Sequence, residues 1–162
     1  MSLLWTYTDQ QAIRPISENK QQDWEGLATE VQFVKLKEFM GADFYQDVVQ
    51  NPTTTANAKL IDGGTYTNGT LTYQFQGLKY VLSYLLYARY ILESDAQDSF
   101  AGFMQIDNEN ARHSSFAQKK NIAEEQKNLA WGYWNDCWEF VCENADDYPY
   151  AKRKRSGKMR FL

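Results

Sequence analysis

Residues 77–95, GLKYVLSYLLYARYILESD, decide the fold, because they form the longest nearly uncharged apolar run in the chain. Apolar residues recur along this run at steps of three and four, and a second, mostly aromatic stripe follows another face. The first stripe consists of Leu78, Val81, Leu82, Leu85, Ala88 and Leu92, and the second of Tyr80, Tyr84, Tyr87 and Ile91. This pattern predicts a buried central helix over about 77–94 that other elements cover from several sides.

Lys79, Ser83 and Arg89 interrupt the run. A membrane span needs about 20 largely apolar residues, so the run is too short and too polar for one. A guanidinium on a buried helix requires a carboxylate or carbonyl partner, or a partner chain. We therefore expect Arg89 to have a structural role and no part of the chain to enter a membrane.

The composition is that of one packed domain: 162 residues, 43% hydrophobic and 15% aromatic, with a mean hydropathy of -0.64. The first residues lack the basic start and apolar core of a signal peptide, which favours a soluble intracellular product. Cys137 and Cys142 lie five apart on one predicted helix, a spacing unsuited to a disulfide. Both are expected to be small buried residues in a reducing compartment.

The remaining pattern is also mainly helical. Ser17 is a plausible cap for a helix that reaches about Met40, and short helices are expected at about 43–49 and 53–60. Asn68-Gly69 lies between β-rich runs and predicts a hairpin over about 65–75, resting on the central helix or on another chain. A long helix over about 115–143 ends in an aromatic segment that we interpret as core. The predicted fold is a compact, mainly α bundle with one small hairpin.

Residues 96–114 show no regular pattern and are expected to form a long loop. Four of them, Phe100, Phe103, Met104 and Ile106, are too apolar for a solvated linker. A partner surface or a flap over the core is favoured. Together with Tyr66 and Tyr73 of the predicted hairpin, they are the candidate protein–protein contacts.

Catalytic and metal-binding residues are scarce. His113 is the only histidine, so a Ser-His-Asp triad or a multi-histidine metal site lacks its residues. The oxygen ligands at 107–110, DNEN, lack the spacing and the glycine of a calcium loop. The glycines after Asp62 precede a hairpin and no lysine follows them, which argues against a phosphate-binding loop. We expect no enzymatic activity, no metal and no cofactor.

Charge divides the chain into a predicted domain at 1–151 and a basic tail at 152–162. The tail holds six of the 17 basic residues and no acid, and the body then keeps 11 basic and 21 acidic residues, a net charge of -10. The six basic residues are Lys152, Arg153, Lys154, Arg155, Lys158 and Arg160. Three roles are open for them: contact with phosphates, contact with an acidic protein surface, or simple solvation.

Several stretches carry a family resemblance: LWTYTDQQAIRPISEN at 4–19, LKEFMGADFYQDV at 36–48, LIDGGTYTNGTLTYQFQGLKYVLSYLLYARYI at 60–91, and the Gly132-Tyr133-Trp134 step. In this order they resemble head-to-tail connector proteins of tailed bacteriophages. More narrowly, they are similar to small ring or adaptor proteins of phages of gut Bacteroidetes, including the crAss-like group. The chain departs from that pattern at FAGFM, 100–104, and in its basic tail.

The resemblance implies a structural virion protein that forms a ring, generally twelvefold, below the portal and extends the DNA channel. Its implied partners are other copies of itself, the portal protein, the next connector or tail protein, and packaged DNA passing through the channel. Its implied location is the neck of the virion, after assembly in the host cytoplasm. An acidic body would repel DNA phosphates and let the DNA slide. The alternative is a small helical nucleic-acid-binding module that uses the basic tail.

Overall fold

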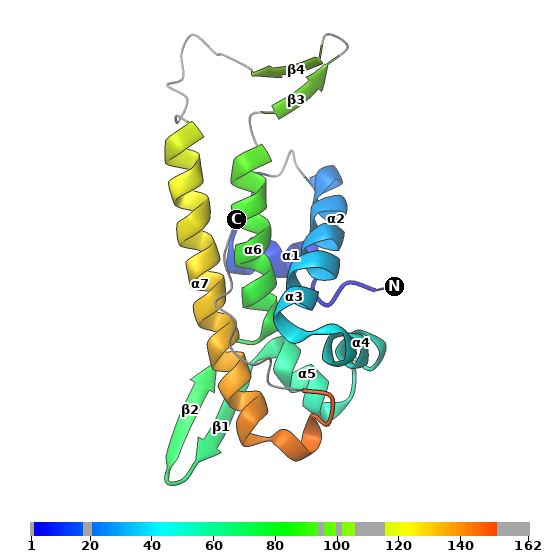
Figure 1. The fold of residues 1–162 in the computed structure, drawn as a ribbon, viewed down its shortest axis with the longest axis vertical. Helices are drawn as coiled ribbons and strands as arrows, with labels where there is room; N and C mark the ends of the chain where they lie inside the picture. The colour runs from blue at the N-terminus through cyan, green and yellow to red at the C-terminus, as the bar shows by residue number, and fades with distance from the viewer. Residues whose placement is uncertain (1, 18–20, 94–95, 100–101, 106–115, 152–162) are drawn as a thin grey trace.

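A computed structural model describes residues 2–17, 21–93, 96–99, 102–105 and 116–151 (Figure 1). The fold is mainly helical, as predicted. Its helices are α1 (Tyr7–Ile13), α2 (Gln21–Glu30), the π-helical η2 (Val31–Leu36), α3 (Lys37–Met40), α4 (Ala42–Gln50), α5 (Thr55–Asp62), α6 (Leu78–Glu93), α7 (Phe116–Glu143) and the 3-10 turn η3 (Ala145–Asp147). Its strands are β1 (Gly64–Asn68), β2 (Leu71–Phe75), β3 (Ala96–Ser99) and β4 (Gly102–Gln105).

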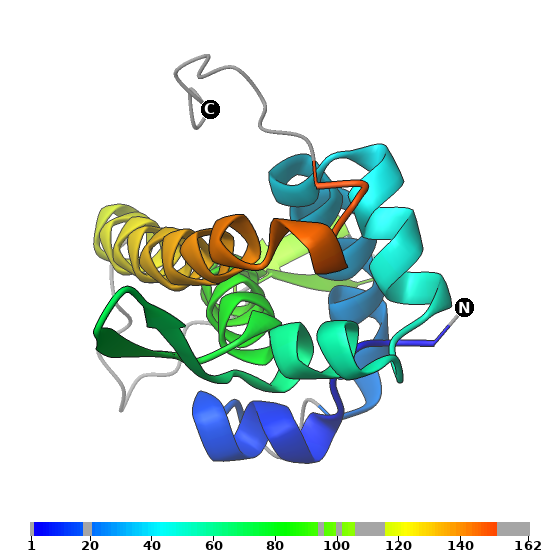
Figure 2. The same ribbon diagram turned by 90° about the horizontal axis from the view of Figure 1, so that it is seen from below.

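Helix α6 is the central helix, and its bounds confirm the predicted 77–94. It packs along α7 in the opposite direction, while α2, η2 and α3 cover a second side and α1 a third (Figures 1 and 2). Leu78, Leu82 and Leu86 are fully buried, as expected for a helix with neighbours on several sides. Helix α7 likewise confirms the predicted 115–143. None of the helices in the described ranges is both long and apolar enough to span a membrane.

Strands β1 and β2 form the predicted hairpin, with Asn68 paired to Leu71 around a two-residue loop. Gly69 takes the first loop position at φ 62°, a left-handed conformation that glycine adopts without steric cost. Within the chain the hairpin rests on α7 rather than on the central helix: the Phe75 and Phe140 rings stack at 4.3 Å between centroids. This stack gives the two-stranded sheet the apolar support that it needs.

Two glycines join the hairpin to the helices on either side of it. Gly63 ends α5 at φ 86° and Gly77 precedes α6 at φ 81°. A Cβ atom on Gly77 would lie 2.4 Å from the Gly63 amide nitrogen, so the two chain segments cross at backbone contact. The start of the central helix is thereby fixed against the end of α5.

The structure corrects several predictions. The expected loop at 96–114 contains the antiparallel pair β3–β4, in which Ala96 pairs with Gln105. The sequence favours an extended or short helical lead-in over residues 3–8, and the structure has helix α1 beginning at Tyr7 and continuing to Ile13. Cys137 is buried as expected, but Cys142 is exposed, because it lies on the outer side of α7. Arg89 has the expected carboxylate partners, yet at the edge of the core rather than within it: Glu93 at 2.7 Å and Glu30 at 3.3 Å.

Candidate protein-interaction surfaces

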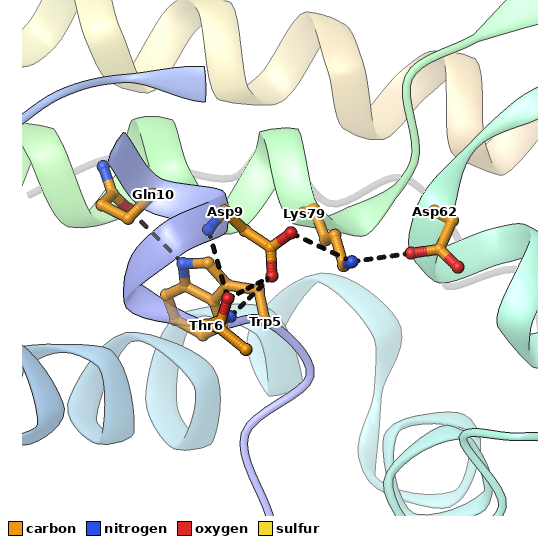
Figure 3. A network of polar contacts seen from close by, with 6 residues as sticks. All are labelled: Trp5, Thr6, Asp9, Gln10, Asp62 and Lys79. Carbon is orange, nitrogen blue, oxygen red and sulfur yellow. Dashed lines mark hydrogen bonds and ion pairs between the residues drawn. The ribbon is translucent and has the colours of Figure 1, made fainter. Parts of the chain in front are cut away.

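A network of ion pairs and hydrogen bonds connects α1, α5 and α6 (Figure 3). Thr6 caps α1 in a capping box with Asp9, whose carboxylate accepts hydrogen bonds from the Thr6 amide and hydroxyl, both at 2.8 Å. The Lys79 ammonium lies 3.2 Å from Asp9 and 2.8 Å from Asp62. This lysine interrupts the apolar run of the sequence because it connects two neighbouring helices to α6.

The pKa values of this cluster follow from its contacts. Partial burial acts to raise the pKa of the Asp9 carboxyl, but the hydrogen bonds from Thr6 and Lys79 outweigh it, so the pKa of Asp9 is lowered. The hydrogen bond to Asp62, with the weaker one to Asp9, raises the pKa of Lys79 despite its partial burial. Asp9 and Lys79 are thereby held in their charged forms, which suits a structural tie rather than proton transfer.

Two buried glutamines attach the N-terminal segment to the body. The Gln32 carbonyl accepts a hydrogen bond from the Leu4 amide at 2.7 Å, and its amide group donates to the Ser2 carbonyl at 3.2 Å. The Gln10 amide donates to the carbonyl oxygens of Arg14, at 2.6 Å, and Ser83, at 3.3 Å. These contacts lie inside the fold, so they serve stability.

The hairpin presents a different kind of surface. Tyr66, a predicted partner contact, is only 8% exposed and packs against Tyr73, Phe75 and Phe140. This prediction is corrected: Tyr66 belongs to the core, since its strand lies on α7. Tyr73 stays 40% exposed, and Leu71, one step further along the same face of β2, is 59% exposed. We call Leu71 and Tyr73 the hairpin face.

Carboxylates line the hairpin's side of α7. Asp136, Glu139 and Glu143 are exposed and recur at steps of three and four on one face of the helix; we call them the acidic rim. Glu143 accepts a hydrogen bond from the Asn68 side chain at 2.8 Å, which places the rim beside the hairpin. Burial, with the charges of the rim, raises the pKa of Tyr66. Burial and the neighbouring Glu139 likewise raise the pKa of Asp136.

A band of half-buried tyrosines follows α6 and α7. Tyr133 packs against Tyr84 at 5.1 Å and Tyr80 at 5.4 Å between ring centroids. The Arg14 guanidinium lies 4.3 Å from the centroid of Tyr87, a cation–π distance. Burial, followed by the hydrogen bond with Tyr84, raises the pKa of Tyr133 to about 12, so the Tyr133 hydroxyl stays neutral near pH 7. Towards the start of α7, Leu129 and Ile122 add exposed apolar area about one turn and about three turns from Tyr133.

The structure brings together only part of the predicted contact set. Phe103 and Met104 belong to β4, whereas Phe100 and Ile106 lie outside the described residues. So do the six basic residues of 152–162, Lys152, Arg153, Lys154, Arg155, Lys158 and Arg160. Leu71 was not among the predicted contacts, although it alternates with Tyr73 and Phe75 and therefore lies on the same face of the strand. It also missed the acidic rim, whose three- and four-residue spacing was readable in the sequence.

Among the residues that the structure describes, no three His, Cys, Asp or Glu side chains are grouped closely enough to hold a metal ion. Residues 36–160 match a protein family described as a family of unknown function, DUF6712. No curated protein and no solved structure matches the chain.

Proposed function

The chain belongs to DUF6712, a family of unknown function, and we propose that it is a head-to-tail connector protein of a tailed bacteriophage. In this proposal it assembles as a ring below the portal, with twelve copies as the expected number, and extends the channel for packaged DNA. Its partners are other copies of itself, the portal protein and the next connector or tail protein. It is a structural protein of the virion neck, assembled in the host cytoplasm, and not an enzyme.

The hairpin face is the observation that carries the proposal. Leu71 and Tyr73 are exposed, yet they lie on a strand whose next inward residue, Phe75, is stacked on Phe140 of α7. Exposed apolar side chains on a rigid support form a preorganised contact, which loses little conformational entropy on binding. Such a contact suits a protein that repeats one interface around a ring.

The charge distribution supports the role in a DNA channel. The body before residue 152 has a net charge of -10. A channel with acidic walls repels phosphates, so DNA passes without binding to it. The resemblance to phage connectors adds the location below the portal.

The test is the mass of the purified full-length protein, alone and after mixing with portal complexes of the same phage at moderate salt. A mass increment on the portal equal to a closed ring is expected. A monomer that ignores portals but binds duplex DNA with steep salt dependence would overturn the proposal in favour of a nucleic-acid-binding module.

A matched pair of variants ties this test to the hairpin face. Leu71→Gln removes an exposed apolar group, and Thr72→Gln places the same side chain on the opposite face of the same strand, where the residue is also exposed. We expect L71Q to weaken ring formation at least tenfold and T72Q to behave as the wild type. Equal behaviour of both variants would remove the hairpin face from the proposal.

A further inference from the structure

We infer that the basic segment 152–162 of one copy binds the acidic rim and the hairpin face of the next copy. The inference rests on the proposed ring and specifies which parts of the chain hold neighbouring copies together. Its occupant is this chain's own C-terminal segment, KRKRSGKMRFL.

Acidic and basic residues occupy two adjoining stretches of the sequence. Residues 128–151 contain five acids and no lysine or arginine, whereas 152–162 contain six basic residues and no acid. Within the described residues, no lysine or arginine forms an ion pair with the acidic rim. Lys59 of α5 directs its ammonium to the Phe140 ring, 5.4 Å from the centroid. The hairpin adds no charge of its own, because residues 63–77 contain neither acid nor base.

The apolar side chains of the basic segment also complement those of the hairpin face. After its cations the segment ends with Met159, Phe161 and Leu162. The hairpin face offers Leu71 and Tyr73 beside the rim. One segment therefore supplies both groups that the surface lacks, namely cations for the carboxylates and apolar side chains for the strand. The cations give the contact its attraction, and the apolar end gives it a direction along the surface.

The hairpin and the point where the described chain ends lie on different sides of the end of α7, which lets successive copies meet through different surfaces. The end of the described chain is fixed near α4 and α5: the Tyr148 hydroxyl donates to the Ala56 carbonyl at 2.7 Å, and its ring packs on Phe44. Figures 1 and 2 both show the hairpin on one side of the end of α7 and the last described residues on the other. A contact between different surfaces of successive copies is heterologous and closes into a ring when the rotation allows.

The reach of the segment is sufficient for this contact. Its eleven residues can extend to at most about 40 Å, more than the width of several helices. The segment can therefore cross a boundary between subunits without any movement of the helical body.

The first experiment measures binding of a fluorescent peptide of residues 152–162 to the full-length chain by anisotropy. The chain carries K152E/R153E/K154E/R155E, so that its own segment does not compete. We expect binding that weakens steeply with salt. Adding E139Q/E143Q should weaken it at least tenfold, whereas E25Q/E125Q, with the same charge change at exposed sites elsewhere, should leave it within twofold. A peptide with serines in place of Met159, Phe161 and Leu162 should bind less tightly.

A second experiment distinguishes neighbouring copies from the same copy. The rim variant E139K/E143K keeps its basic segment, and the segment variant K152E/R153E/K154E/R155E keeps its rim. Each alone should be monomeric, and their mixture should contain 1:1 dimers by native mass spectrometry, because one variant supplies each surface. Circular dichroism and unfolding midpoints check that both are folded.

The outcomes are distinct. Three results would overturn the inference. The peptide does not bind, or it binds equally well to the chain with E139Q/E143Q, or the mixture of variants contains no dimers. In the last case the segment binds its own copy. If the wild type forms rings on portals while the peptide fails to bind, the connector proposal stands and this contact is wrong. If the peptide binds and dimers form but portals are ignored, the connector proposal falls and the contact stands.

Discussion

The start of α6 and the end of α7 lie at the same end of the helix pair but are built on different principles. Around the start of α6, charges are paired inside the chain: Lys79 lies between Asp9 and Asp62, and buried glutamines bind backbone groups. Around the end of α7, three carboxylates form a rim without an ion pair among the described residues, and Leu71 and Tyr73 remain exposed. The first region pairs its charges within the chain, whereas the second leaves carboxylates and apolar side chains exposed.

This difference separates stability from assembly. Substitutions in the internally paired region should lower the free energy of unfolding and leave assembly unchanged at temperatures where the chain is folded. Substitutions on the acidic rim and hairpin face should do the reverse. The buried side of α7 beneath the rim is the exception, because it supports the hairpin.

Phe140→Ala should have the largest effect on stability. Phe140 is buried, stacks on Phe75 and packs against Tyr66 and Tyr148. Loss of its ring leaves a cavity, so the free energy of unfolding should fall by about 3–5 kcal/mol in urea titrations. Ile122→Ala, at a site 39% exposed, is the control, with an expected loss below about 1 kcal/mol. A loss of similar size in both variants would show that the hairpin does not depend on this stack.

Gln32→Met tests the internally paired region without changing side-chain volume much. The substitution leaves the Leu4 amide without its acceptor, and an unsatisfied buried donor costs about 1–3 kcal/mol. Urea titration measures the loss, and faster hydrogen exchange at the Leu4 amide locates it. Gln11→Met in α1 is the comparison, because Gln11 is only half-buried and its side chain donates hydrogen bonds to Tyr7 and Ile16, so its loss leaves no backbone amide without an acceptor. Normal exchange protection at Leu4 in Q32M would contradict the assigned hydrogen bond.

Lys79→Met should cost about 1 kcal/mol at pH 7, since the pair with Asp9 is partly exposed. The pKa of Asp9 is lowered, so its contribution is present above its ordinary pKa of 3.8 and disappears as the pH falls below it. The pKa of Lys79 is raised, so its contribution is lost only as the pH rises beyond the ordinary 10.5. The difference between wild type and K79M should therefore be largest between these limits.

Unfolding midpoints across pH test this prediction. Lys35→Met is the control, because Lys35 forms a single exposed pair with Glu38 and should contribute little at any pH. A K79M difference that persists unchanged at pH 2 would show that packing of the lysine stem, and not its charge, supports α1.

The sequence predicted the elements whose signal is local. The three- and four-residue apolar steps gave α6 and α7, and Asn68-Gly69 gave the hairpin, because helix periodicity and turn chemistry depend on neighbouring residues. The support of the hairpin by Phe140 was not predictable, since it joins segments more than 60 residues apart. The sequence left an extended and a short helical form open for the segment that leads into α1, because its capping box, Thr6 and Asp9, was not recognised as a start signal.

The sequence predicted the exposure of the candidate contact residues less well than the elements that carry them. Tyr66 and Tyr73 carry the same side chain on paired strands, and sequence alone gave no reason to separate them. The structure buries Tyr66 because the rings of Tyr73, Phe75 and Phe140 pack around it. Lys79 was read as an interruption of the apolar run, since its partners Asp9 and Asp62 come from distant segments.

Asp136→Asn should have the smallest effect on stability and the opposite sign. Burial and Glu139 raise the pKa of Asp136, so the folded chain disfavours the charged carboxylate and loses stability as the pH rises through the ordinary pKa of 3.8. The neutral amide removes this cost, and the free energy of unfolding at pH 7 should rise by at most about 0.5 kcal/mol. Added salt screens the repulsion between Asp136 and Glu139, so it should stabilise the wild type more than D136N.

The same substitution tests the contact with the basic segment. If a cation of the neighbouring copy neutralises Asp136, D136N should weaken the peptide binding described above. A clear loss of stability in D136N would instead show that Asp136 has a partner within its own chain, and the contrast between the start of α6 and the end of α7 would not extend to this residue.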